Sequence, residues 1–189
     1  MIYIGILLAV IAEFKYMHSV IEGKSKPNFS AWGIFTISMT LVLISSYSLG
    51  ARSSLYIIGI FTVLHLITTT LAFQFRKFAL TLFEKILLLL VALSLILWVT
   101  TENAWTALLI NIFVDTLGFI SILYKLYLHP KTEDTFAWTL SFIAYGVNLF
   151  AITKWTPQEY LFTISNIFWI GLISLLSLRK KCSARERST

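Results

Sequence analysis

Charged residues are scarce in this chain of 189 residues. They make up only 13% of the sequence, against 58% hydrophobic residues, and the mean hydropathy is +0.82. A soluble domain of this size does not carry so large an apolar fraction, so the composition indicates a multi-pass membrane protein. Hydrophobic runs occupy nearly the whole chain. The sequence therefore leaves no room for a soluble catalytic domain.

Cysteine is almost absent as well. Cys182 is the single cysteine, which excludes a disulfide within the chain. Its place after Lys180 and Lys181 would suit palmitoylation, although an inert thiol beside the membrane is the more common case. No His, Cys and carboxylate cluster has metal-ligand spacing, and neither a glycine-rich phosphate loop nor a nucleophile elbow is visible. The sequence thus predicts no metal and no cofactor.

Seven apolar runs account for most of the sequence. Crossing the hydrocarbon takes about 20 residues, and all runs but the fourth approach that length. The fourth is shorter, so we expect it to extend back into 78–85, with Glu84 and Lys85 at the membrane boundary. The first run has no basic start and no cleavage site, so it is predicted to be a retained helix. The runs are 1–21, 31–49, 54–75, 86–100, 104–123, 136–153 and 160–178.

Basic residues are distributed unevenly between the gaps that separate these runs. When successive gaps are assigned to alternate sides, twelve of the fifteen Lys and Arg residues fall on one side, whereas Arg52 and Lys154 fall on the other and Lys15 lies inside the first run. Short basic loops stay in the cytoplasm, so the pattern predicts a protein of the cell (inner) membrane with its N-terminus outside and its C-terminus in the cytoplasm. The net charge of +6 is then explained by lipid headgroups, and nucleic acid is excluded as a partner.

Two stretches that lead into apolar runs resemble each other. In each, a proline is followed by polar residues, an aromatic residue and an Ala-Trp pair. Proline ends the preceding helix, and Trp32 and Trp138 are expected to anchor the helices at the level of the lipid headgroups. The stretches run from Lys26 and Pro27 to Trp32, and from His129 and Pro130 through Lys131 and Glu133 to Trp138.

This similarity predicts an all-α integral membrane protein built from two parallel three-helix repeats joined by a linker helix, a 3+1+3 plan. Three helices are an odd number, so one extra crossing is needed to give both repeats the same orientation. Chance similarity between apolar helices is the alternative. The predicted units are 1–75 for the first repeat, 76–103 for the linker helix, 104–178 for the second repeat and 179–189 for a basic cytoplasmic tail.

Three charged residues lie at membrane depth, where a charge costs about 2.5–3.5 kcal/mol and usually faces the interior of a bundle. These are Glu13, Lys15 and Asp115. Glu13 precedes Pro27 by fourteen residues and Asp115 precedes Pro130 by fifteen, so the two acids lie at nearly matching depth in the proposed repeats. We expect Asp115, and with less weight Glu13, to bind a solute or a proton.

Polar side chains also recur at helical spacing within the runs. Such stripes either line a polar path or hold the helices together by hydrogen bonds. His65 on its own is more often a satisfied core residue than a ligand or a proton relay. The stripes comprise Asn111 with Asp115 and Gly118, Tyr145 with Asn148, Thr163 with Asn166, and Thr62 with His65 and Thr69.

A resemblance to a known group accompanies these patterns. The stretch Asp115-x-x-Gly118-Phe119, Lys125, His129-Pro130, Glu133 and Trp138, together with Lys24-x-Lys26-Pro27-Asn28 and Trp32, resembles uncharacterised prokaryotic seven-helix proteins that look like distant relatives of the PQ-loop and SWEET transporters. The resemblance implies the 3+1+3 fold, passage of a small polar solute, Asn166 as a substrate contact, and dimerisation as an open option. The Pro-Gln pair itself is missing, and Ile120 stands where a proline is expected.

Three functions follow as hypotheses. The first is a transporter or facilitator for a small polar solute, with Asp115, Glu13, Asn148 and Asn166 at the binding site. The second is a membrane partner without transport activity, such as an assembly or sensor subunit, which would use the loop Lys125–Glu133 and the basic tail. The third, and most remote, is an intramembrane enzyme that acts on lipid, for which no catalytic set is visible. The sequence favours the first, leaves the solute open, and predicts no other enzyme.

Overall fold

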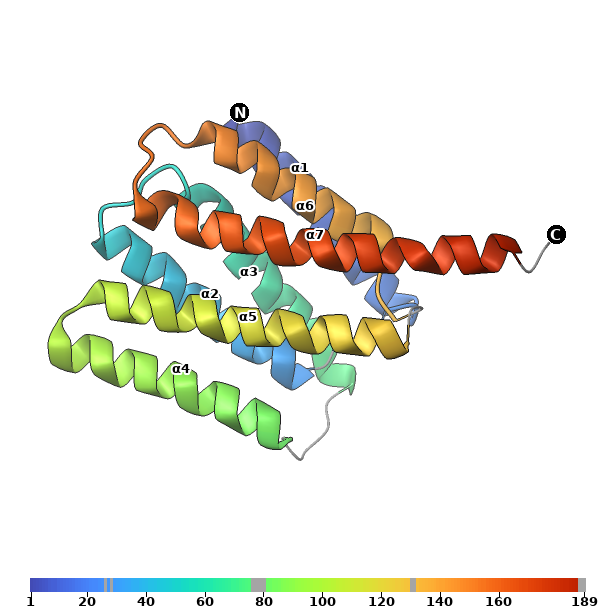
Figure 1. The fold of residues 1–189 in the computed structure, drawn as a ribbon, viewed down its shortest axis with the longest axis horizontal. Helices are drawn as coiled ribbons and strands as arrows, with labels where there is room; N and C mark the ends of the chain where they lie inside the picture. The colour runs from blue at the N-terminus through green and yellow to red at the C-terminus, as the bar shows by residue number, and fades with distance from the viewer. Residues whose placement is uncertain (26, 28, 76–80, 130–131, 187–189) are drawn as a thin grey trace.

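The computed structural model describes residues 1–25, 27, 29–75, 81–129 and 132–186 (Figure 1). Within these residues every regular element is helical, and seven α-helices are present. The expected all-α architecture is therefore observed. The elements are α1 (Ile2–Ile21), α2 (Phe29–Ser48), α3 (Leu55–Ala72), the 3-10 turn η1 (Phe73–Phe75), α4 (Leu82–Thr101), α5 (Ala104–Leu128), α6 (Thr135–Ala151) and α7 (Pro157–Glu186).

Six of the described helices form a closed ring. Around the ring, α1 contacts α3, α3 contacts α2, α2 contacts α5, α5 contacts α7, α7 contacts α6, and α6 contacts α1 again. Helix α4 lies outside the ring against α5 and α2, at the lower edge of Figure 1. Helices α1 and α6 approach closely at Gly5, where a Cβ atom would lie 3.4 Å from the carbonyl oxygen of Ala144. Each of the six helices therefore has one side that faces the interior of the ring.

The length and composition of the helices indicate a multi-pass membrane protein. Helices α1 to α5 and α7 are each long and apolar enough to cross a membrane, whereas α6 has 17 residues and is shorter. In α4, which packs on only one side, large apolar side chains are exposed along the whole helix, as expected for contact with lipid tails. These side chains include Leu82, Ile86, Leu89, Leu93, Ile96 and Val99.

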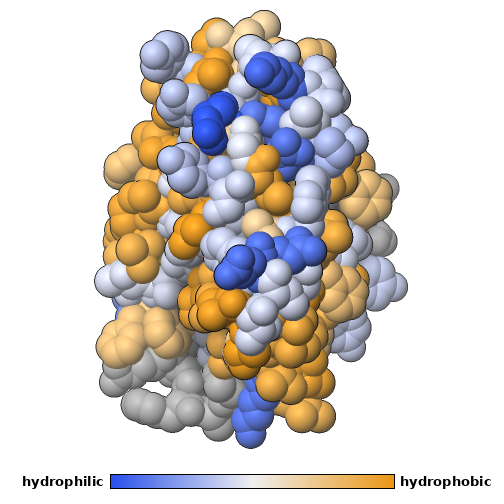
Figure 2. Space-filling model, turned by 90° about the vertical axis from the view of Figure 1, so that its left-hand side faces the viewer, coloured by the Kyte–Doolittle hydropathy of each residue, from blue (hydrophilic) through white to orange (hydrophobic). Residues whose placement is uncertain are grey.

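The helix connections divide between the two ends of the bundle. The links α2–α3, α4–α5 and α6–α7 lie at the left-hand end of Figure 1, and the last residues of α1, α3 and α5 lie at the other. Viewed from the left-hand end, hydrophilic residues cross the middle of the face and hydrophobic residues lie around its margin (Figure 2). The polar loops thus cap a bundle whose sides are apolar.

Local sequence signals explain where several helices begin and end. Gly23 and Gly50 have positive φ angles of 71° and 88°, and the N–H of the residue after each reaches back to the last turn of α1 or α2, as in a Schellman motif. Helix α4 begins with a capping box, in which the Thr81 hydroxyl accepts from the Glu84 N–H and the Glu84 carboxylate accepts from the Thr81 N–H at 2.7 Å. The expected extension of the fourth run into 78–85 is thereby confirmed for 82–85.

One predicted unit differs from the structure. The segment from 179 onward is expected to be a separate tail, yet α7 continues as a helix to Glu186 and projects beyond the bundle in Figure 1. Nothing in 179–186 interrupts the helix, because this segment contains neither proline nor glycine. Pro130 of the second repeat stretch lies outside the described residues.

Candidate functional site

A cavity lies at the centre of the ring, and all six ring helices contribute to it. Its volume of about 20 Å³ is enough for one water molecule. Helix α4 provides none of its lining. The lining residues are Glu13 from α1, Trp32, Phe35 and Met39 from α2, Phe61 and His65 from α3, Asp115, Phe119 and Ile122 from α5, Trp138, Ser141 and Tyr145 from α6, and Asn166 and Ile170 from α7.

Glu13 and Asp115, which the sequence places at matching depth, both line this cavity. Both are buried, with 5% and 3% of their surface exposed. Tyr145 of α6 lines the same cavity. Lys15, the third charged residue at membrane depth, is not part of the lining. The two acids therefore belong to one site rather than to separate helix contacts.

The Glu13 carboxylate is held by two side chains of α3. The Nε2 atom of His65 lies 3.4 Å from Glu13 Oε1, and the Thr68 hydroxyl donates to Oε2 at 3.1 Å. The other ring nitrogen of His65, Nδ1, is buried without a hydrogen-bond partner among the described residues. His65 thus has a carboxylate partner on one side and an unused nitrogen on the other.

The Asp115 carboxyl differs from Glu13 because its Oδ1 atom has no hydrogen-bond partner among the described residues. A buried carboxyl oxygen without a partner is costly, since water is excluded and nothing replaces its hydrogen bonds. Such a group in a native structure calls for an explanation. Asp115 is the strongest single indication of a binding function.

Aromatic rings make up most of the remaining wall. The rings of Phe61 and Tyr145 stack with centroids 4.7 Å apart, and those of Phe35 and Phe119 lie 5.3 Å apart. The Phe35 ring packs directly against Gly118 of α5, and a Cβ atom at that position would overlap the ring. Of these four aromatic residues, Phe35 and Phe61 are not singled out by the sequence patterns. Phenylalanine in an apolar helix is indistinguishable from core or lipid-facing residues until the ring of helices is known.

A hydrogen-bonded cluster around Glu133, which precedes α6, adjoins the cavity through Trp138. Its carboxylate accepts hydrogen bonds from the Tyr16 hydroxyl and the Trp138 indole N–H, each at 3.1 Å, and from Lys125 Nζ at 2.9 Å. Glu133 is only 4% exposed. The Tyr16 ring also packs on Trp32 with centroids 5.1 Å apart. This cluster joins α1 and α2 to α5 and α6, and its two tryptophans line the cavity.

The two tryptophans of the repeat stretches have partners inside the bundle. Trp32 and Trp138 are predicted to lie at the lipid headgroups, but both are buried and line the cavity. Each packs against Tyr16, and Trp138 in addition donates to Glu133. Their rings are directed into the bundle because Tyr16 and Glu133 offer them partners there. Both tryptophans are therefore part of the cavity wall, and their anchoring at the headgroups stays a prediction.

At the left-hand end of the bundle in Figure 1, Glu159 in the first turn of α7 binds the residues that lead into α3. Its carboxylate accepts from three successive backbone N–H groups, those of Arg52 at 2.6 Å, Ser53 at 3.1 Å and Ser54 at 2.8 Å, and from the Ser54 hydroxyl at 2.7 Å. Successive N–H groups at a helix start form a natural anion site. The sequence patterns do not identify Glu159, since its partners lie more than one hundred residues away. Helix α7 is thereby tied to the start of α3.

Of the three amides of the predicted site, Asn111 and Asn148 are not among the residues that line the cavity. Asn111 instead donates to the Ser94 hydroxyl of α4 at 2.5 Å and to the Ala107 carbonyl, so it connects α5 to α4. Asn148 is buried, with its Nδ2 atom unpartnered among the described residues, near the contact with Gly5 of α1. Asn166, by contrast, lines the cavity while its Nδ2 donates to the Phe162 carbonyl. Only Asn166 of the three amides is placed to contact a solute.

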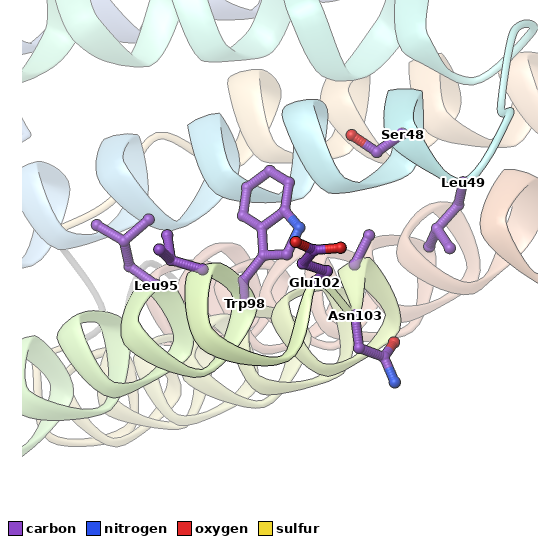
Figure 3. A pocket seen from close by; sticks show the side chains of 8 residues that line it. Ser48, Leu49, Leu95, Trp98, Glu102 and Asn103 are labelled. Atoms are coloured by element: carbon purple, nitrogen blue, oxygen red, sulfur yellow. The ribbon is translucent and has the colours of Figure 1, made fainter.

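Two larger hollows lie outside the ring. One of about 670 Å³ is open at the end of the bundle, where Trp98 and Glu102 point from α4 toward Ser48 and Leu49 at the end of α2 (Figure 3). The other, of about 410 Å³, lies between α2, α4 and α5, and Phe35 lines both it and the central cavity. In neither hollow do the lining side chains form a set of converging, unpartnered polar groups like that around Asp115. The central cavity is therefore the better candidate site.

Comparison of the chain with models of protein families gives no match, and comparisons with curated proteins and with solved structures give none either. The resemblance to the PQ-loop and SWEET transporters thus gains no support from them. The functional argument depends on the cavity itself.

Proposed function

We propose that this protein carries a small polar solute across the membrane and binds it in the central cavity. The observation that carries the proposal is that two acids from corresponding positions of α1 and α5 line one enclosed site, where Asp115 Oδ1 has no partner. Buried ionisable residues inside membrane bundles commonly mark solute and ion pathways. Glu13, His65 and Asn166 complete the polar part of the site.

The arrangement of the helices supports two parallel three-helix repeats. Helix α3 packs against α1 and α2, as α7 packs against α5 and α6. Across the ring, α1 contacts α6 in the same way that α2 contacts α5. Exchanging the first three helices with the last three therefore reproduces the same set of neighbours. A site between such repeats is a known plan for carriers, with α4 as the linker helix outside the ring.

The clusters around Glu133 and Glu159 each join one proposed repeat to the other. Tyr16 of α1 bonds to Glu133 before α6 at one end, and Glu159 of α7 bonds to the start of α3 at the other. The proposal assigns the structure, in which both clusters are formed, to a closed state of the carrier. Breaking one cluster at a time would expose Asp115 to one side of the membrane only. With the orientation expected from the basic loops, the Glu133 cluster faces the cytoplasm.

Reconstituted vesicles test this proposal. A screen of mixed small solutes, read out by mass spectrometry, is expected to find at least one whose uptake falls tenfold or more in Asp115→Asn vesicles. The amide keeps the shape of the side chain but removes the charge that the solute or a proton would neutralise. Asp134→Asn is the matched control, because Asn caps a helix as well as Asp does and should continue to accept from Ala137 N–H. Its uptake should stay within about twofold of the wild type.

The proposal fails if no solute shows uptake above protein-free vesicles, or if every uptake is the same in the Asp115→Asn variant. A chain that binds other membrane proteins without transporting anything would give the first result. Correct folding of both variants is checked by their thermal unfolding in detergent before reconstitution.

A further inference from the structure

We infer that the solute of the carrier proposed above is a small organic cation, of the quaternary ammonium kind, held by Asp115 and a box of aromatic rings. The inference depends on the proposed function and adds the chemical class of the solute to it. It starts from the charge of the wall. Among the described residues that line the cavity there are two carboxyl groups, but neither lysine nor arginine. An anion would meet no fixed positive partner there.

The two carboxyl groups are not equivalent. Glu13 already has His65 and Thr68 as partners, whereas Asp115 Oδ1 is buried without one. A cation beside Asp115 would supply the counter-charge that this oxygen lacks, and it would remove the cost of burying the charge alone. The cavity therefore offers one carboxyl group, that of Asp115, to a single positive charge.

Aromatic rings provide the second, independent part of the evidence. Six of the fourteen lining residues are Phe, Tyr or Trp, contributed by α2, α3, α5 and α6. The faces of such rings attract alkylated ammonium groups, and aromatic boxes are the usual way in which proteins recognise them. A neutral sugar would require many hydrogen-bonding groups, yet Ser141, Asn166 and His65 are the main uncharged polar side chains of this wall.

A metal ion fits this wall poorly. Hard metal cations take six or more oxygen ligands, and no group of three or more His, Cys, Asp or Glu residues that could hold a metal is found in the described part of the chain. In the closed state the cavity of about 20 Å³ is too small for the cation. Binding therefore requires the helices of the ring to move apart and enlarge the cavity. Met39 lies in the wall, and its flexible side chain can change conformation to make room for the cation.

Equilibrium binding to the purified full-length protein in nanodiscs tests the inference. The probes are choline and 3,3-dimethylbutan-1-ol, which has the same shape but carries no charge. Choline is expected to bind, and the neutral alcohol at least tenfold more weakly. The Asp115→Asn variant should lose at least tenfold in choline affinity. Phe119→Leu should lose several-fold, whereas Phe113→Leu, on the same helix but 53% exposed, should bind as the wild type does.

The outcomes separate this inference from the proposed function. If choline does not bind, binds no better than the alcohol, or binds equally well to Asp115→Asn, the inference is wrong. The carrier proposal survives that result when another solute in the vesicle screen still depends on Asp115. If no solute depends on Asp115 in vesicles, both fail. Choline uptake that requires Asp115 and the Phe119 ring would support both.

Discussion

Replacing Glu133 with alanine is expected to lower the free energy of unfolding by about 3–5 kcal/mol, because three donors lose their shared acceptor. The Tyr16 hydroxyl and the Trp138 indole N–H lie inside the bundle, so water cannot replace the carboxylate fully. Lys125 would lose its buried counter-charge at the same time. The melting temperature in detergent should fall by roughly 6–20 °C, at about 2–4 °C per kcal/mol for a chain of this size.

Glu22→Ala is the matched control for Glu133→Ala. The Glu22 carboxylate also pairs with a lysine, Lys24 at 2.9 Å, but both side chains are exposed just after α1. Exposed ion pairs are screened by water and contribute little to stability, so this variant should melt close to the wild type. Equal melting temperatures for the two variants would show that the Glu133 cluster does not hold the bundle closed.

Replacing Glu159 with alanine is expected to destabilise the protein by about 3 kcal/mol or more. The three N–H groups before α3 would lose an acceptor that also complements the positive end of the helix dipole. Glu159→Gln should be less damaging, because the amide keeps one oxygen acceptor but not the charge. Thermal unfolding in detergent measures both changes.

The matched control for Glu159→Gln is Glu102→Gln at the same end of the bundle. Glu102 is exposed and lies at the end of α4 with a φ of 52°. Glutamine keeps nearly the size and shape of this side chain, so little change in the melting temperature is expected. We expect the melting temperature to be highest for the wild type and Glu102→Gln, lower for Glu159→Gln, and lowest for Glu159→Ala. An unchanged Glu159→Ala melting temperature would contradict the role given to this carboxylate.

The helices could be predicted from the sequence because their signals are local. Apolar runs of membrane length, glycines after α1 and α2, and the Thr81–Glu84 pair each act within a few residues. The runs found in the sequence agree with the seven described helices to within a few residues at most ends. The continuation of α7 past 178 was missed, because its hydrophobicity ends there although its helical backbone does not.

The site could be predicted only in part. Charge at membrane depth is rare enough to be informative, and the two acids that the sequence places at nearly matching depth both line the central cavity. The helical spacing of Asn111 and Asp115 suggested that both line the same polar path. Asn111 instead donates a hydrogen bond to the Ser94 hydroxyl of α4. The carboxylate of Glu159 binds residues far away in the chain. Such partners follow from the packing of helices, which apolar sequences leave largely undetermined.

The central claim is that Asp115 lies in a cavity that opens to water, and cysteine labelling tests it most directly. In a Cys182→Ser background, Ser141→Cys places a thiol in the cavity wall, and Ser94→Cys places one in the buried contact between α4 and α5. A small cationic thiol reagent is expected to modify the Ser141→Cys variant in vesicles at least tenfold faster than the Ser94→Cys variant, and faster than an anionic reagent of similar size. Equal, negligible labelling of both variants would mean that the cavity never opens, and would contradict the account.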